Sequence, residues 1–96
     1  MQFLVSVSLN SDKSKEPPPK DVAEAESEAV RGLYMEGLIR QIWVRADKRG
    51  GFMIVEAESA EVVATKFAML PLVREGILET PEIVALAPYW GFAPRG

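Results

Sequence analysis

Alternation of apolar and polar positions predicts four strands along the chain. In the first, at residues 2–9, the apolar positions recur every second residue, at Phe3, Val5, Val7 and Leu9. Comparable patterns predict strands at 38–47, 52–58 and 82–88. The turn sequence Lys48-Arg49-Gly50-Gly51 joins the second and third strands, so these two are expected to form an antiparallel hairpin.

Two helices are predicted between these strands. The first, at 22–36, begins after Asp21 as N-cap and stops at Gly37, and the second is capped by Ser59 and ended or kinked by Pro71. At 100° per residue, the first helix gathers one apolar side from Val22, Ala25, Ala29, Val30 and Leu33. Glu26 falls near the middle of that side.

The resulting order, β-α-β-β-α-β, predicts one α+β domain over residues 1–96 with the ferredoxin-like fold, a sheet with both helices on one face. Both faces of the later strands carry apolar residues, whereas two helices cover only one face. A second copy packed sheet to sheet, as a dimeric α/β barrel, would cover the other face. We therefore expect a homodimer or a higher homo-oligomer.

The C-terminal tail, residues 89–96, contains Tyr89, Trp90 and Phe92, which have few neighbours in their own domain. The tail is expected to contact another subunit, with folding along its own sheet edge as the alternative. The proline-rich connection at 10–20 is either a plain linker or the rim of a site.

Composition restricts the chemistry that the chain can carry out. The sequence contains no Cys and no His, which excludes thiol nucleophiles, imidazole bases, and Cys or His metal ligands. No acidic pair has convincing metal spacing. A net charge of −3 with scattered basic residues argues against nucleic-acid binding. No apolar run is long enough to span a membrane, and the first residues lack a charged signal-peptide region, so a cytoplasmic location is expected.

Glu26 is the first candidate for catalysis. A carboxylate centred on an apolar helix face loses hydration, which raises its pKa and suits it to accept and return a proton near neutral pH. The alternatives are that Glu26 reaches solvent near the helix start or pairs with an arginine of the sheet.

Residues of the second strand are candidates to complete a pocket. Gln41, Trp43 and Arg45 alternate on one face and offer an amide, an apolar wall and a fixed positive charge. If this face meets the helices, Arg45 is the polarising cation; if it meets the partner copy, Arg40 takes the helix side. Tyr34, at the edge of the first helix, is a possible pocket wall, with simple packing as the alternative.

Three short motifs resemble the muconolactone delta-isomerase family. They are Glu36-Gly37 before the strand with Trp43, the Glu56-x-Glu58-Ser59-x-Glu61 junction, and Leu70-Pro71-Leu72. The resemblance implies dimeric ferredoxin-like barrels that assemble into larger rings, decamers in the isomerase, with C-terminal segments reaching neighbouring sites. It also implies a proton shift in an unsaturated lactone without cofactor or metal, with the counterpart of Glu26 as acid/base.

The chain departs from the family where the isomerase has histidines on its first and second strands, because Phe3 and Gln41 stand there. A more apolar pocket follows, with Phe3, Tyr34, Gln41, Trp43 and the tail's Trp90 as candidate substrate contacts. We expect an isomerase or cyclase of a larger, more hydrophobic substrate than muconolactone, such as a lactone or a polyketide-like or terpenoid intermediate of secondary metabolism. The alternatives are a cofactor-independent monooxygenase and a non-catalytic ligand-binding or assembly module.

Overall fold

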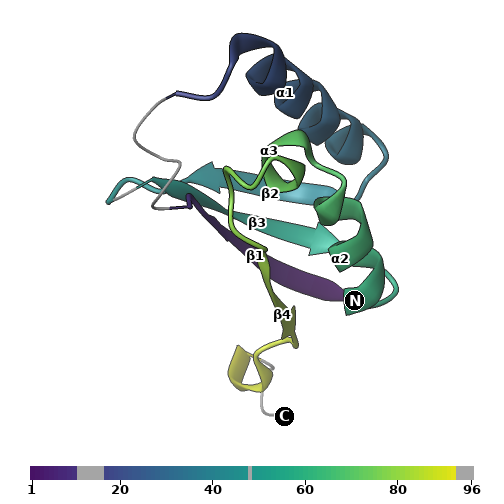
Figure 1. Cartoon of the computed structure of the whole chain (residues 1–96). Coiled ribbons are helices and arrows are strands. Elements are labelled where there is room, and N and C mark those ends of the chain that lie inside the picture. Colours follow the sequence, from purple (N-terminus) through teal and green to yellow (C-terminus); the bar gives the residue numbers. More distant parts are fainter. Residues whose placement is uncertain (11–16, 48, 93–96) are drawn as a thin grey trace.

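The computed structural model describes residues 1–10, 17–47 and 49–92. Its centre is one antiparallel sheet with the strand order β2-β3-β1-β4 (Figure 1). The strands are β1 (Gln2–Ser8), β2 (Ile39–Val44), β3 (Gly50–Glu56) and β4 (Glu82–Leu86). This order, with β1 and β3 in the middle, is the predicted ferredoxin-like arrangement.

The helices α1 (Lys20–Met35), α2 (Ala60–Ala68) and α3 (Pro71–Arg74) lie together on one face of the sheet (Figure 1). The prediction of Asp21 as N-cap is wrong: α1 begins after Pro19, whose ring sets an extended backbone, and Asp21 lies in the first turn. Ser59 does cap α2, because its Oγ accepts a hydrogen bond of 3.2 Å from the backbone N–H of Val62.

The core lies between these helices and the helix-facing side of the sheet. Its fully buried side chains include Phe3, Val5 and Val55 of the central strands and Val63 and Phe67 of α2. In α1, by contrast, Leu33 is the one buried residue among those described. The N-terminal half of α1 therefore does not pack directly onto the sheet, and this spacing makes room for a site.

None of the helices in the described residues lies on the other sheet face (Figure 1). In the strand register Gln41, Ile54, Leu4 and Val84 form one row across this face, and Trp43 lies opposite Phe52 in the next. Apolar side chains thus occupy both faces, as the sequence predicts. A second copy covering the open face stays a prediction.

The described residues continue beyond the sheet after β4. After β4, a short 3-10 helix, η1 (Trp90–Phe92), projects away from the sheet and helices (Figure 1), with the rings of Tyr89 and Trp90 5.7 Å apart between centroids. Contact of the tail with another subunit stays a prediction, and residues 93–96 lie outside the described part, as do residues 11–16 of the proline-rich connection. None of the described helices is long and apolar enough to cross a membrane.

Candidate active site

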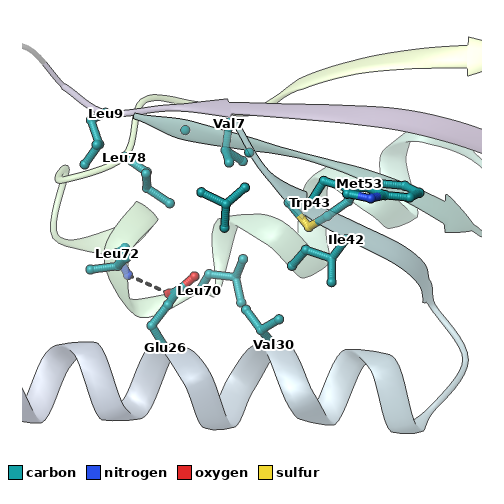
Figure 2. A pocket seen from close by; sticks show the side chains of 13 residues that line it. Val7, Leu9, Glu26, Val30, Ile42, Trp43, Met53, Leu70, Leu72 and Leu78 are labelled. Carbon is teal, nitrogen blue, oxygen red and sulfur yellow. Dashed lines mark hydrogen bonds between the residues drawn. The ribbon is translucent and has the colours of Figure 1, made fainter. Parts of the chain in front are cut away.

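A cavity of about 260 Å³ lies between α1, α3 and the helix-facing side of the sheet (Figure 2). Its sheet wall includes Val7, Ile42 and Met53, and α1 contributes Val30. The remaining wall comes from the segments around α3, namely Leu70, Leu72 and Leu78. The surroundings are almost entirely aliphatic, so an apolar ligand displaces water here at little cost.

Glu26 lines this cavity from α1 and is the one ionisable side chain among the described lining residues. One carboxylate oxygen, Oε1, accepts a hydrogen bond of 2.9 Å from the backbone N–H of Leu72. The other oxygen points toward the cavity (Figure 2). Neither alternative from the sequence holds, because Glu26 is partly buried and accepts its hydrogen bond from a backbone amide, not from an arginine.

The local sequence explains why Leu72 needs this partner. Pro71 is the first residue of α3 and has no N–H, and the preceding Leu70 has no side-chain acceptor to cap the helix. The carbonyl of Leu70 accepts from Val73 and Arg74, which leaves the Leu72 amide for Glu26. The carboxylate of α1 therefore serves as a distant cap for α3, and this contact fixes its orientation.

Burial and hydrogen bonding shift the pKa of Glu26 in opposite directions. Desolvation in the apolar cavity raises the pKa of the Glu26 carboxyl, and the hydrogen bond from Leu72 lowers it by a smaller amount. The net result is a pKa above the ordinary glutamate value, in the direction that favours acid/base chemistry closer to neutral pH.

The two arginines expected as polarising cations do not line this cavity. Arg45 follows Trp43 on the open-face side, where its guanidinium lies 5.1 Å from the ring centroid of Phe52. Its Nε and Nη2 donate to Asp47 at 2.9 and 2.6 Å. Arg40 is exposed, and its Nε donates to the carbonyl of Gly37 at 2.7 Å.

Of the five expected substrate contacts, Trp43 borders the cavity at β2, although its register opposite Phe52 places its side chain on the open sheet face. The other four do not border it: Phe3 is 1% exposed within the core, Gln41 lies on the open sheet face, and Tyr34 and Trp90 are exposed at 57% and 74%. The aliphatic lining from Val7, Leu72 and Leu78 was not anticipated from the sequence. The Leu70-Pro71-Leu72 motif was the available signal for part of it.

The described residues offer no metal site. No three acidic side chains among them come together as ligands.

A family model for muconolactone delta-isomerase matches residues 1–90. The chain belongs to the muconolactone delta-isomerase family. Comparison with curated protein sequences gives no significant match. Membership of this family identifies the chain as an isomerase-type enzyme of small molecules and agrees with the resemblance seen in the sequence.

Two solved structures share the fold. A crystal structure of muconolactone isomerase superposes with a TM-score of 0.78 at 20% identity, covering 100% of this chain and 98% of that one. A 5-chloro-2-hydroxyhydroquinone dehydrochlorinase from Burkholderia phenoliruptrix, in complex with 2,5-dihydroxybenzoquinone, superposes at 0.70 with 19% identity, covering 91% and 94%. At these identities the likeness is one of fold.

Proposed function

We propose that this family member is a cofactor-independent isomerase or cyclase with Glu26 as general acid/base. The substrate is a fairly hydrophobic unsaturated lactone or polyketide-like carbonyl compound. One observation carries the proposal: an oriented carboxylate with a raised pKa presents an oxygen to an otherwise aliphatic cavity.

The reaction needs only proton movement. The ionised carboxylate removes a proton from the carbon at one end of an allylic unit conjugated to the substrate carbonyl, so that a C–H bond breaks, an O–H bond forms and the substrate becomes a dienolate. The same carboxyl group then returns the proton to the other end of the unit. The double bond shifts and Glu26 regains its charge, and no oxidant or reductant is involved.

The hydrogen bond from Leu72 supports this assignment. It holds Oε1 of Glu26 in place, so the second oxygen keeps one position while both ends of the allylic unit pass within its reach. The cavity volume lies just below the range for ligand pockets, about 300–1,000 Å³, so we place the reacting ring inside and larger substituents at the opening.

The proposal assigns proton transfer to Glu26 alone. Arg40 and Arg45 bind Gly37 and Asp47 away from the cavity and have no part in the reaction within one protomer. Trp43 borders the cavity at β2, but its register opposite Phe52 places its side chain on the open sheet face, so we assign it no contact with the reacting ring.

The test is proton exchange on a panel of butenolides that carry apolar substituents. In D₂O, NMR is expected to show deuterium entering the allylic carbons in the presence of the wild type and a rate about 10²–10⁴-fold lower with Glu26→Gln. Glu24→Gln is the matched control, since Glu24 is an exposed glutamate of the same helix, and it is expected to retain the wild-type rate.

Three results would overturn the proposal. Equal exchange by the wild type and Glu26→Gln would remove the acid/base role. Oxygen uptake coupled to substrate loss would favour the monooxygenase, and tight binding of the panel without exchange by the wild type would favour a binding module.

A further inference from the structure

The cavity beside Glu26 opens at the edge strand β2, where its lining is exposed and apolar. We infer that Val44 is a specificity-determining residue of this site and that, together with Ile42, it binds an alkyl substituent of the substrate that extends out of the cavity. The inference rests on the proposed function for the lactone ring and its place inside the cavity. It adds where the substituent lies, which side chains contact it and what its chemistry is.

The exposure of the lining residues locates the opening. Two rows of the sheet lie along the cavity, and in both the residues become more buried from β2 toward the middle of the sheet. In one row Val44 of β2 is 84% exposed, whereas Gly51 is buried and Val7 is 9% exposed. In the other row Ile42 is 49% exposed and Met53 is buried. The closed end of the cavity therefore lies at the central strands and the open end at β2.

The strand register shows which way Val44 points. Val44 lies opposite Gly51, and Gly51 lies opposite Val7. Residues directly opposite each other on neighbouring strands point to the same face of a sheet, and Val7 belongs to the core under the helices. Val44 therefore points to the helix side, and Gly51 contributes no side chain between Val44 and Val7. A ligand that leaves the cavity along this row contacts Val44.

Val44 lies at about the same level of the site as Glu26. Glu26 is ten residues before Glu36, the C-cap of α1, which corresponds to about 15 Å along a helix. Val44 is six residues after Leu38, on the other side of the connecting turn, which corresponds to at most about 20 Å along a strand. The part of a ligand that protrudes from the opening is thus close to the level of the carboxylate, where the proposed reaction takes place.

The side chains at the opening define the chemistry of the substituent. Val44 and Ile42 offer only methyl and methylene groups, so contact with an alkyl chain removes apolar surface from water on both partners. The cavity of about 260 Å³ encloses the ring and the first carbons of such a chain. Contact with Val44 begins with the later carbons, so the site favours lactones with long alkyl substituents over those with short ones.

The experiment compares two ligands that differ in chain length. The probes are saturated, unreactive γ-lactones with a methyl or an octyl substituent, and binding is measured by calorimetry. The wild type is expected to bind the octyl lactone at least thirtyfold more tightly, since each fully buried methylene contributes roughly fourfold in affinity. Val44→Thr keeps the shape of the side chain and replaces one methyl group by a hydroxyl. The ratio of the two affinities is expected to fall at least threefold, because the chain removes that hydroxyl from water.

Val62→Thr is the matched control, because Val62 is an exposed valine of α2 away from the described lining, and it is expected to keep the wild-type ratio. A ratio that Val44→Thr leaves unchanged, or that Val62→Thr lowers as much, would overturn the inference. Equal binding of the two lactones by the wild type, or binding of neither, would also overturn it.

The probes do not react, so this result is independent of the exchange assay. Failed exchange with an affinity ratio that depends on Val44 would reject the proposed reaction and retain the alkyl-binding role. Exchange that depends on Glu26, with a ratio that does not depend on Val44, would retain the reaction and reject the present inference.

Discussion

Glu26 has two roles that make opposite demands on the same carboxylate. As the acceptor for the Leu72 amide it links α1 to α3, a function that the oxygen of a neutral amide side chain can also perform. As a base it must carry a charge inside an aliphatic cavity, which lowers the stability of the folded protein. We expect this conflict to be measurable, because a residue kept for catalysis alone often reduces stability.

The corresponding prediction concerns the pH dependence of stability in Glu26→Gln. The folded-state pKa of Glu26 is raised, so its contribution to stability is fully present below the pKa of about 4.3 in the unfolded chain and is lost as the pH rises through the folded-state pKa. Gln stays neutral throughout. In chemical denaturation, Glu26→Gln is therefore expected to gain stability relative to the wild type between pH 4 and pH 8, by under about 1 kcal/mol.

Glu24→Gln provides the comparison at the same pH values. Because the Glu24 side chain is exposed, the stability difference between this variant and the wild type is expected not to change with pH. A Glu26→Gln variant that loses stability relative to the wild type as the pH rises would contradict the prediction. That outcome would mean that the hydrogen bond of the ionised carboxylate to Leu72 outweighs the cost of its desolvation.

At the scale of elements, β2 decided which side chains reach the cavity. Ile39 lies opposite Val55, but the next registered pair is Gln41 with Ile54, so the ladder is irregular at Arg40. Because of this bulge, Ile39 and Ile42 both lie on the helix-facing side. In a regular strand that starts at Ile39, the second helix-facing residue would be Gln41. Simple alternation therefore could not assign Gln41, Trp43 and Arg45 to a face.

Two glycines near the end of α1 are expected to change the stability of the protein in opposite directions when each is replaced by alanine. Gly37 has φ +88°, a conformation that costs a residue with a side chain about 1–2 kcal/mol, so Gly37→Ala is expected to destabilise the protein by about that amount. Gly32 is exposed within α1, and an added Cβ there meets no atom within 4 Å. Gly32→Ala is expected to stabilise by roughly 0.5–1 kcal/mol through helix propensity.

Denaturant unfolding of both variants checks this pair. Because the same methyl group is added in each case, hydrophobicity is matched and the backbone conformation is the variable. If both variants changed the free energy of unfolding in the same direction, the assignment of Gly37 as the residue that stops the helix would be contradicted.

At the scale of the whole molecule, the protomer is extended for its length. Its radius of gyration is 15.0 Å, whereas a compact domain of this size is expected at about 12.5 Å, and its longest extent is 56 Å. The projecting η1 contributes to this shape, and the uncovered sheet face leaves Trp43 53% exposed. Such a protomer is expected to gain stability from association.

The prediction for assembly is that the wild type forms at least a homodimer through the open face. Ile54→Glu places a charge in the middle row of that face and is expected to shift the protein to monomers at micromolar concentration, as measured by sedimentation velocity or light scattering. The fold is expected to persist, since the Ile54 side chain lies on the face opposite the core.

Val62→Glu is the control, because Val62 is an exposed apolar residue of α2 on the helix side. It is expected to leave the oligomeric state unchanged. A monomeric wild type, or an Ile54→Glu variant with the wild-type mass, would contradict this mode of association.

The sequence by itself determined the order of elements, the fold class, the capping by Ser59, the break at Pro71 and the position of Glu26 on the apolar side of α1. These depend on local periodicity and on the backbone preferences of single residues. Only the tertiary structure decided that Glu26 bonds the Leu72 amide and that Arg40 and Arg45 lie outside the cavity. The reason is physical: the first depends on contact between residues 46 positions apart and the second on a bulge in the strand register, and neither leaves a periodic signal in the chain.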